Sequence, residues 1–251
     1  LGPDFAPLTP PPSTSVVVLV ASLILYSLSC LRPSASGYRL CCENAISTKI
    51  YGGGAAHAHS IFLPKIQFKQ KFGDFRTQGI VVIFSTKIET TLPKMDNVEG
   101  NHCLLILDRL EDPQNFGQII RTAVCAGVRG IIIPKHDSCK VTDRVIQISQ
   151  GAFTEIPIYE VNNIHQTIDL LKKEEFWIVA MENSLKAKDW HKIDYKGKIA
   201  IVAGSEGRGI KKIILDNCDF QTTIPMQGET NSLNVSAAVS AILFERLRQI
   251  S

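Results

Sequence analysis

Three polar stretches close to the ends of apolar runs carry the residues whose types and spacing could do chemistry. They occupy residues 112–123 (D-P-Q-N-F-G-Q-I-I-R-T-A), 201–210 (I-V-A-G-S-E-G-R-G-I) and 227–232 (Q-G-E-T-N-S). The second has three glycines within six residues, so its backbone can turn sharply at a strand end and present N–H and C=O groups to a ligand. Such a loop can hold a small molecule, and the other two can supply side chains that act on it.

The first and second stretches hold the charged candidates. Arg121 offers a planar, permanently charged donor fork that suits a phosphate or carboxylate. Asn115 can cap the helix that follows it, and Gly117 permits close approach of another backbone. Glu206 stands between glycines, where a core position is not expected. A solvated arginine, an ordinary cap and a simple turn explain the same residues, so these stretches alone leave the alternatives open.

The third stretch leads into the last helix of the chain. Ser232 can cap that helix, because its hydroxyl can accept a backbone N–H two or three residues further on. The helix repeats apolar residues at helical spacing and has small residues in its first turns, so another segment can pack closely against it. These positions are Val235, Ala237, Ala238, Val239, Ser240, Ala241, Ile242 and Leu243. A terminal core helix accounts for the pattern equally well.

Several common site types have little support. The glycine stretch is G-x-E-G-x-G rather than G-x-G-x-x-G, and no Gly-Lys-Ser/Thr follows a glycine loop, so neither a dinucleotide fingerprint nor a Walker A loop is present. No G-x-S-x-G elbow precedes Ser232, which argues against a serine hydrolase. The seven cysteines include no C-x-x-C pair and no Cys/His cluster at zinc spacing. We therefore expect free, mostly buried thiols in a reducing compartment and no metal.

Short apolar runs alternate with helical patterns from residue 101 onward. We expect strands at 103–108, 130–134, 156–161, 176–181, 198–203 and 222–226, and helices at 116–127, 142–150, 164–173 and 210–215. This alternation predicts a parallel sheet covered by helices on both faces. In such sheets ligands bind beyond the carboxyl ends of the strands, and the three polar stretches fall there.

The first hundred residues differ from this pattern. Residues 1–61 predict a leader of low complexity, in which the apolar run at 16–31 is short for a membrane span and resembles a signal segment without its basic start. That run is the only basis for membrane association. Residues 62–98 mix lysines with phenylalanines, which is compatible with RNA contact or with a basic surface, and 79–85 predicts a buried strand. The net charge of +3 permits a nucleic-acid partner without requiring one.

Taken in order, the three stretches resemble the motifs of a known family. N-F-G-Q-I-I-R-T-A, then A-G-S-E-G-R-G-I, then I-P-M-x-G-x-x-x-S-L-N-V-S-x-A resemble the SpoU (TrmH) family of RNA ribose 2′-O-methyltransferases over residues 101–251. More narrowly, L-L-I-L-D, D-N-C-D and the final F-E-R-L-R-Q-I-S resemble the bacterial branch that methylates a guanosine of large-subunit ribosomal RNA, and its organellar relatives. Only R-T-Q-G-I-V at 76–81 is similar to the family's preceding RNA-binding domain.

The resemblance implies a fold and a cofactor. The fold is an α/β domain of the SPOUT type, in which the final strand, loop and helix pass through an earlier loop as a deep trefoil knot; knots are otherwise nearly absent from proteins. Members are homodimers that bind S-adenosylmethionine in the knot. Carried over by motif, the cofactor would meet the backbone at Gly204, Ile224 and Leu233, with Met226 and Gly209 nearby.

The resemblance also implies a catalytic set, which is Asn115, Arg121, Glu206, Ser232 and Asn234. The expected reaction is in-line attack of a ribose 2′-hydroxyl on the methyl group of the cofactor. Arg121 has been suggested as the base in this family, but a guanidinium normally stays protonated. We therefore expect Arg121 to clamp a phosphate and stabilise charge on the oxygen, while phosphate or water takes the proton. Asn115, Ser232 and Asn234 would orient Arg121 and the ribose, and Glu206 would order its loop.

Three questions stay open at this point. The RNA substrate is ribosomal or, alternatively, transfer RNA, and a non-catalytic knotted RNA-binding or assembly protein is a further alternative. The resemblance implies the cytoplasm for a bacterial protein and a mitochondrion or plastid for a eukaryotic one. The nucleotide that is methylated cannot be read from the motifs.

Overall fold

The computed structural model of the chain describes residues 15–20, 65–72, 81–86, 88–92, 100–228 and 232–251. The chain forms two compact units, residues 18–84 and residues 1–17 together with 85–251. Half of β1 (Ser15–Val20) and most of β2 (Val81–Thr86) belong to the smaller unit, and these two strands pair with each other. This unit also contains α2 (Lys65–Phe72).

The predictions for the first hundred residues are tested only in part. β2 confirms a strand close to the predicted 79–85, although its side-chain burial lies outside what is described. Residues 16–20 of the apolar run at 16–31 belong to β1, and the remainder of that run lies outside the described residues. Within the described part of the chain, no helix has the length and apolar character needed to cross a membrane. The predicted divisions at 1–61, 62–98 and 101–251 stay predictions.

The larger unit is built around one parallel sheet. Among the described residues its strands are β3 (His102–Asp108), β4 (Gly130–Pro134), β5 (Ile158–Val161), β6 (Trp177–Met181), β7 (Lys188–Asp189), β8 (Lys198–Gly204) and β9 (Phe220–Thr223). They lie in the order β5-β4-β3-β8-β6-β9-β7, and each neighbouring pair is parallel. Every residue of β3 and β4 is buried, as the unbroken apolar runs of a parallel sheet require.

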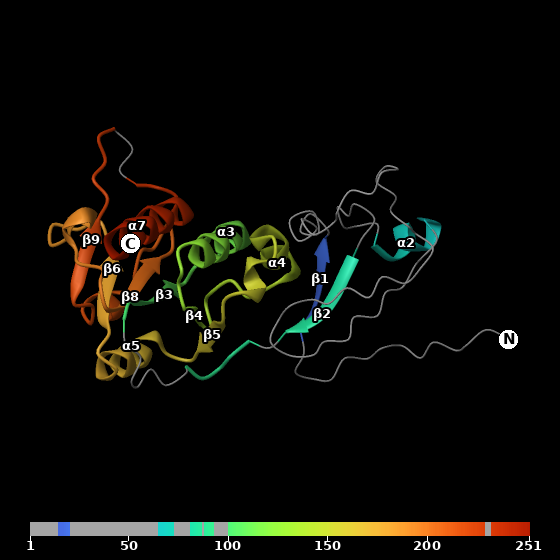
Figure 1. The fold of residues 1–251 in the computed structure, drawn as a ribbon, viewed down its shortest axis with the longest axis horizontal. Coiled ribbons are helices and arrows are strands. Elements are labelled where there is room, and N and C mark those ends of the chain that lie inside the picture. The colour runs from blue at the N-terminus through green and yellow to red at the C-terminus, as the bar shows by residue number, and fades with distance from the viewer. Residues whose placement is uncertain (1–14, 21–64, 73–80, 87, 93–99, 229–231) are drawn as a thin grey trace. The chain divides into compact units, whose positions relative to one another are not determined.

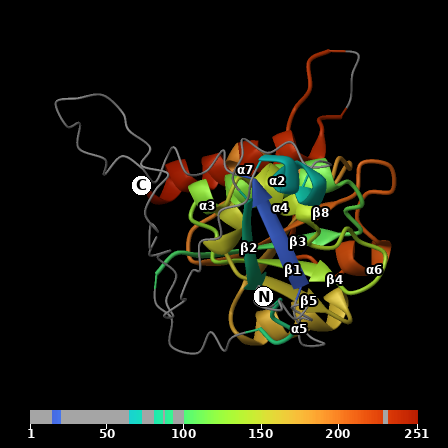
Figure 2. The same ribbon diagram turned by 90° about the vertical axis from the view of Figure 1, so that its right-hand side faces the viewer.

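Helices cover both faces of this sheet (Figures 1 and 2). They are α3 (Pro113–Cys125), α4 (Asp143–Ser149), α5 (Ile164–Lys173), α6 (Lys212–Leu215) and α7 (Val235–Ile250), with short 3-10 helices η3 (Ala152–Thr154) and η4 (Trp190–Lys192). Helices α3, α4 and α7 lie on one face, and α5 lies on the other. The α/β fold predicted from the sequence is therefore confirmed, whereas the trefoil knot stays a prediction.

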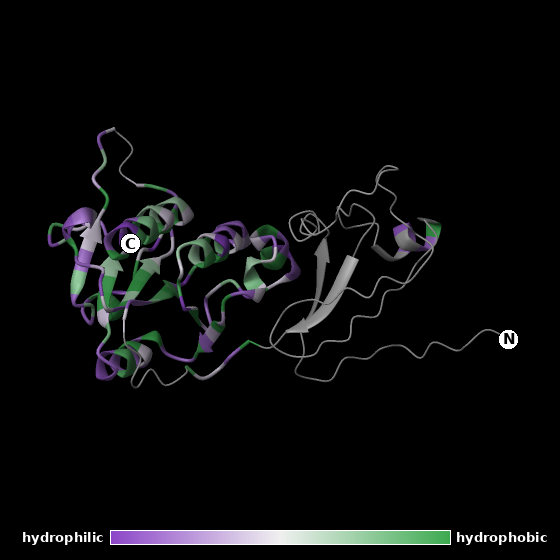
Figure 3. Ribbon diagram, in the orientation of Figure 1, coloured by the Kyte–Doolittle hydropathy of each residue, from purple (hydrophilic) through white to green (hydrophobic). Residues whose placement is uncertain are grey.

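Two apolar layers hold the sheet and helices together. On the α5 side, Ile168 and Leu171 pack with Ile106 of β3 and Val202 of β8 in one buried cluster, to which α6 adds Ile214. On the opposite face the helices bury Phe116, Ile119, Ile120, Val239, Ile242 and Leu243. Figure 3 shows the result, with hydrophobic strands at the centre and hydrophilic residues on the outer sides of the helices. Each fully buried side chain of this size contributes roughly 1.5–3 kcal/mol to folding.

Several predicted boundaries need correction. The last strand ends at Thr223 rather than at residue 226, because Pro225 has no N–H to donate to a ladder. The helix predicted at 116–127 begins three residues earlier and ends at Cys125. The two-residue edge strand β7 was not predicted. The helix at 164–173 agrees with the prediction at both ends.

The four cysteines in the described part of the chain form no disulfide bond with one another. Cys103 and Cys139 are buried, Cys218 is partly buried and Cys125 is exposed. Burial raises the pKa of Cys103 to about 11 and that of Cys218 to about 12. Since a thiol is reactive as a thiolate, these two cysteines have a packing role at neutral pH.

Candidate active site

The carboxyl ends of neighbouring strands meet at one edge of the sheet. Asp108, the last residue of β3, pairs with Gly204, the last residue of β8. Met181 at the end of β6 pairs with Ala203 of β8 on one side and with Thr222 of β9 on the other. The loops that follow β3, β8 and β9 therefore begin close together, as predicted from the three polar stretches.

The first loop is short because α3 begins early. Asp112 is its N-cap, with its carboxylate accepting the N–H groups of Gln114 at 3.0 Å and Asn115 at 3.2 Å, and Pro113 takes the first helical position. The prediction that Asn115 caps this helix is therefore wrong. Because the cap is provided by Asp112, the Asn115 side chain, which is buried, is available for contacts with the other loops.

Glu206 joins the three loops. Its Oε1 atom accepts hydrogen bonds from Asn115 Nδ2 at 3.1 Å, Asn234 Nδ2 at 2.6 Å and the backbone N–H of Val235 at 3.3 Å. Asn234 Nδ2 also donates to Asn115 Oδ1 at 2.9 Å. We call these three side chains, Asn115, Glu206 and Asn234, the amide–carboxylate cluster. The carboxylate lies at the N-terminus of α7, where the helix dipole favours negative charge.

Asn234 uses both ends of its side chain. Its Oδ1 atom accepts the N–H groups of Ser236 at 2.9 Å and Ala237 at 3.4 Å, so Asn234 is the N-cap of α7. The prediction that Ser232 caps this helix is wrong, because the helix begins at Val235 and Asn234 is its N-cap. The same residue thus starts α7 and holds Glu206 through its amide N–H groups.

The glycine loop after β8 folds back on itself. The N–H of Gly209 donates to the carbonyl of Ser205 at 2.9 Å, and Gly209 has φ +61°, a left-handed conformation that favours glycine. A Cβ atom on Gly204 would lie 2.3 Å from the carbonyl carbon of Gly209 and 2.5 Å from the nitrogen of Ile210. Glycine is therefore required at 204, and the predicted cofactor positions Gly204 and Gly209 are in contact.

Two residues that fix this loop were missed by the sequence reasoning. Asp108 is buried, and its carboxylate accepts the N–H of Lys211 at 2.8 Å. The next residue, Arg109, donates to the carbonyl of Gly209 at 3.3 Å and lies 3.5 Å from the Asp108 carboxylate. An acidic residue that ends an apolar strand run is a signal that could have indicated this role. Together they hold the glycine loop against the end of β3.

Arg121 lies apart from the amide–carboxylate cluster. It is exposed on α3, and its Nη1 donates to Gln150 Oε1 at 2.8 Å. Gln150 ends α4 in a left-handed conformation, with φ 51° and ψ 38°, which is uncommon for a residue other than glycine. Gln150 was also missed, although a glutamine before Gly151 at a predicted helix end was visible in the sequence.

Close packing of α3 and α4 brings Gln150 to Arg121. A Cβ atom on Gly117 would lie 2.5 Å from Cβ of Ile148 and 2.9 Å from the carbonyl oxygen of Val145. This confirms that Gly117 permits close approach, here of helix α4. On its other side α3 packs against α7, where Thr122 Oγ1 lies 3.2 Å from Ser240 Oγ and Ser236 Oγ donates to Gln118 at 2.8 Å. Small residues of α7 allow this contact.

The remaining predicted residues lie on the segment between β9 and α7. Ile224 and Met226 are partly buried directly after β9, whereas Ser232 and Leu233 are exposed just before α7. Leu233 is 44% exposed. No hydrogen bond of the described residues joins Ser232 to the amide–carboxylate cluster. The structure thus brings Asn115, Glu206 and Asn234 together, whereas Ser232 and Leu233 are exposed.

The carboxylates of Glu182 and Glu206 lie at this edge and suit a positively charged ligand. Glu182, which follows β6, reaches the glycine loop, with its Oε2 3.5 Å from where a Cβ on Gly209 would lie. Glu206 is exposed, and none of its described hydrogen bonds uses Oε2. Among the described residues no group of three His, Cys, Asp or Glu side chains could hold a metal ion. Two carboxylates beside exposed backbone suit an organic cation.

Comparison with known proteins agrees with these features. A sequence model described as the SpoU rRNA methylase family matches residues 102–244. A Staphylococcus aureus protein named for the TrmH family of tRNA/rRNA methyltransferases is 43% identical over 176 residues, which are 68% of this chain and 71% of that protein.

Solved structures are similar as well. An AdoMet-bound rRNA methyltransferase from Sinorhizobium meliloti aligns with a TM-score of 0.64 and 25% identity, over 75% of this chain and 71% of that one. A structure titled RNA 2′-O ribose methyltransferase aligns with a TM-score of 0.61 and 25% identity, over 72% of this chain and 68% of that one. Since the family model covers more than half of the sequence, this chain belongs to the SpoU rRNA methylase family.

Proposed function

We propose that the protein transfers a methyl group from S-adenosylmethionine to a ribose 2′-hydroxyl in RNA, at a guanosine of large-subunit ribosomal RNA. The observation that carries this proposal is the convergence of three loops on Glu206, which accepts hydrogen bonds from Asn115, Asn234 and Val235. Asn115, Glu206 and Asn234 each belong to one of the three family motifs, the first on α3, the second on the glycine loop and the third at the start of α7. The motifs therefore meet at the carboxyl edge of the sheet, where a site of a parallel α/β fold is expected.

The residues present fit S-adenosylmethionine. Its methyl group is activated by a positively charged sulfur, and the carboxylates of Glu182 and Glu206 supply negative charge at this edge. Gly204 and Gly209 keep the loop free of side chains where backbone groups would meet the ligand. We assign the backbone at Gly204, Ile224 and Leu233 to cofactor binding, with Met226 and Gly209 close by.

We assign Arg121 to binding the RNA. Its guanidinium is exposed and retains donors beyond the one that binds Gln150, so it can take a phosphate bidentately. We assign it to clamping the phosphate beside the target ribose and to stabilising charge on the 2′-oxygen as the bond to the methyl group forms. The 2′-hydroxyl proton passes to that phosphate or to water. The main catalytic contribution is alignment of the attacking oxygen with the methyl group.

The other predicted residues have supporting roles in this proposal. Asn115, Glu206 and Asn234 hold the glycine loop and the start of α7 in one arrangement. Ser232, which is exposed, would orient the ribose. Orientation of Arg121, which the sequence assigned to Asn115, Ser232 and Asn234, is supplied by Gln150 in the described contacts.

The nature of the RNA rests on the relatives. The S. aureus relative is named for both tRNA and rRNA, and the S. meliloti neighbour is an rRNA enzyme. The C-terminal resemblance to the large-subunit branch favours ribosomal RNA, with transfer RNA as the alternative. We also propose that the protein acts as a homodimer, because Arg121 stands apart from the amide–carboxylate cluster and a second copy could bring these groups together.

Mapping of 2′-O-methyl groups tests the proposal. Large-subunit ribosomal RNA and transfer RNA would be prepared from cells with and without the protein, and each ribose methyl group located by mass spectrometry. We expect loss of one 2′-O-methylguanosine from large-subunit RNA and its return after incubation with the purified protein and S-adenosylmethionine. A change confined to transfer RNA would favour the alternative substrate. Unchanged ribose methylation in both RNAs would contradict the proposal.

A further inference from the structure

One segment outside the candidate active site carries a net positive charge equal to that of the whole chain. Residues 186–198 (K-A-K-D-W-H-K-I-D-Y-K-G-K) contain five lysines and two aspartates, a net charge of +3. The whole chain has 27 basic and 24 acidic residues, also a net charge of +3, so the rest of the chain is neutral on balance. We call residues 186–198 the basic strap. A local excess of this kind is the electrostatic footprint of a nucleic-acid surface.

The basic strap is held firmly against the end of α7. Gln249 donates to the carbonyl of Ile193 at 3.0 Å and accepts the N–H of Tyr195 at 3.0 Å. Tyr195 is buried, and its hydroxyl lies 3.5 Å from Thr222 Oγ1. The strap therefore presents its lysines from a fixed backbone.

Most of the charge on the strap is available for a partner. Lys192 forms an ion pair with Asp189 at 2.7 Å. Lys186, Lys188 and Lys196 are exposed, and none of them has an ion pair among those of the described residues. Since surface lysines that are not paired keep their full charge for phosphates, these three are the first candidates for backbone contact.

An aromatic pair, the exposed Trp177 and the partly buried Phe220, adjoins the strap. Trp177 is 57% exposed at the start of β6, and its ring centroid lies 5.6 Å from that of Phe220 on β9. The Lys188 ammonium lies 5.8 Å from the Phe220 ring centroid, which connects the aromatic pair to the strap. Aromatic faces beside lysines are the arrangement on which unpaired bases stack while the backbone meets positive charge.

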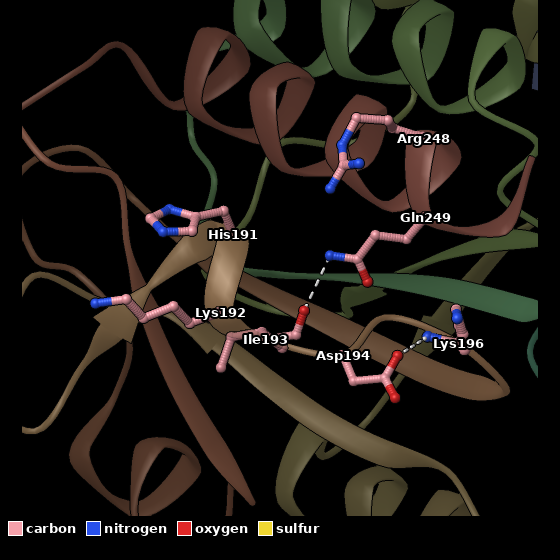
Figure 4. A pocket seen from close by; sticks show the side chains of 7 residues that line it. All are labelled: His191, Lys192, Ile193, Asp194, Lys196, Arg248 and Gln249. Carbon is pink, nitrogen blue, oxygen red and sulfur yellow. Dashed lines mark hydrogen bonds between the residues drawn. The ribbon is translucent and has the colours of Figure 1, made fainter.

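A hollow lies on the α7 side of the strap (Figure 4). Its volume is about 460 Å³, and its lining consists of His191, Lys192, Ile193, Asp194, Lys196, Arg248 and Gln249. Of its three cationic side chains, Arg248 forms an ion pair with Glu245 at 2.8 Å and Lys192 one with Asp189 at 2.7 Å, whereas Lys196 has none among those of the described residues. The polar lining suits a ribose of the same strand that contacts the lysines.

We propose that the basic strap, together with Trp177 and Phe220, is a second RNA-docking surface that binds an unpaired stretch of the substrate. The inference rests on the proposed function in that it takes the substrate to be RNA. Helix α7 has 16 residues, with Asn234 of the amide–carboxylate cluster at one end and Gln249 at the strap, so the two sites lie roughly 20 Å apart. A long RNA reaches both sites, whereas a short one reaches only the active site.

RNA binding by a charge variant tests the docking surface. The K186Q/K188Q/K196Q variant would be titrated with a labelled unstructured RNA of about 20 nucleotides, longer than common single-strand site sizes. Loss of three phosphate contacts lowers the slope of log K against log salt by about 2. The matched control R129Q/K173Q/K212Q removes the same charge from exposed positions elsewhere and should keep the wild-type slope. Equal slopes for both variants would overturn the inference.

A second variant tests the aromatic pair without changing charge. Trp177→Ala should weaken binding of the same RNA roughly tenfold, because one stacked base is lost. Its thermal unfolding and its sedimentation are measured alongside. If Trp177→Ala binds the RNA with wild-type affinity, the aromatic part of the inference is overturned. It is also overturned if the variant differs from the wild type in self-association but not in RNA binding.

Enzyme kinetics separate this inference from the proposed function. With long ribosomal RNA, the strap variant should show a raised KM and an unchanged kcat, and the difference should vanish with a minimal RNA around the target. A wild-type protein that binds the labelled RNA through the strap but transfers no methyl group would contradict the proposed function alone. Wild-type methyl transfer with the same KM in all variants would contradict the docking surface alone.

Discussion

Two parts of the candidate active site are held in opposite ways. Asn115, Glu206 and Asn234 come from three elements and are joined by three side-chain hydrogen bonds of 2.6–3.1 Å. Arg121 lies on the same helix as Asn115, yet it is exposed and binds only Gln150 among its described hydrogen bonds. The cluster is fixed by the fold before any ligand arrives, whereas most donors of Arg121 are left for a partner.

This difference indicates that the cluster and Arg121 have separate functions, the first in shaping the cofactor loop and the second in binding RNA. A group that shapes the cofactor loop benefits from being locked, because a preorganised loop loses little entropy on binding. A group that meets RNA must keep its hydrogen-bonding capacity until the RNA arrives. We therefore expect changes in the cluster to affect stability and cofactor binding, and changes at Arg121 to affect methyl transfer alone.

The largest effect is expected at Arg121. Arg121→Ala should lower the rate of methyl transfer roughly 10²- to 10³-fold, the usual cost of losing one donor that stabilises charge in a transition state. Arg121→Lys keeps the charge and loses the fork, so its rate should fall between those of the alanine variant and the wild type. Single-turnover transfer of labelled methyl to ribosomal RNA measures both. A lysine variant with the wild-type rate would contradict the clamp.

Glu206→Ala should reduce the free energy of unfolding by about 1–3 kcal/mol. The substitution leaves Asn115 Nδ2, Asn234 Nδ2 and the Val235 N–H without their shared acceptor. Glu206→Gln keeps an acceptor oxygen and should be closer to the wild type in urea denaturation, although it removes the charge that faces the cofactor. If alanine and glutamine variants unfold at the same urea concentration as the wild type, the cluster does not hold the loops together.

A smaller effect is expected at Gly117. Alanine improves helix propensity by about 1 kcal/mol, but its Cβ would clash with Ile148 and the Val145 carbonyl, and overpacking costs about 1–3 kcal/mol. Because a backbone atom of α4 must move, we expect net destabilisation in thermal unfolding. Gly207→Ala is the control, since a Cβ there meets nothing within 4 Å. Equal melting temperatures for the two variants would show that the α3–α4 contact can relax.

The smallest effect concerns the far end of α7. Hydrogen bonds from Arg248 and Gln249 lower the pKa of Glu245 to about 2, from an ordinary value of 4.5. A carboxyl group with a lowered pKa stabilises the fold above its ordinary pKa, and the contribution is lost as pH falls from about 4.5 to about 2. Melting temperatures of the wild type and Glu245→Gln should therefore differ at pH 7 and converge near pH 2. A constant difference would contradict this.

Much of the fold could be predicted because the signals are local. Apolar runs such as C-L-L-I-L-D and G-I-I-I-P place β3 and β4 within one residue of the prediction, and the periodicity at 164–173 predicts α5 correctly. Helix starts were harder. Asp112 and Asn115 are both suitable N-cap residues for α3, and Ser232 and Asn234 are both suitable for α7. Which residue of each pair caps the helix depends on contacts with segments that are distant in the sequence.

The site itself was predictable only through its motifs. The sequence indicated that Asn115, Glu206 and Asn234 belong together, but the shared oxygen of Glu206 depends on loops that are distant in the chain. The contact of Arg121 with Gln150 depends on how closely α3 and α4 pack, which Gly117 permits but does not specify. Spacing along α3 does indicate the separation, because six residues make about one and two-thirds turns and put Arg121 on another face of the helix than Asn115.

Calorimetric titration with S-adenosylmethionine tests the division between the cluster and Arg121 most directly. The account predicts that the wild type and Arg121→Ala bind the cofactor with equal affinity, and that Glu206→Ala binds it roughly tenfold or more weakly, since the loss of about 1.4 kcal/mol is a factor of ten. Absence of binding by the wild type, or equal binding by all three proteins, would contradict it.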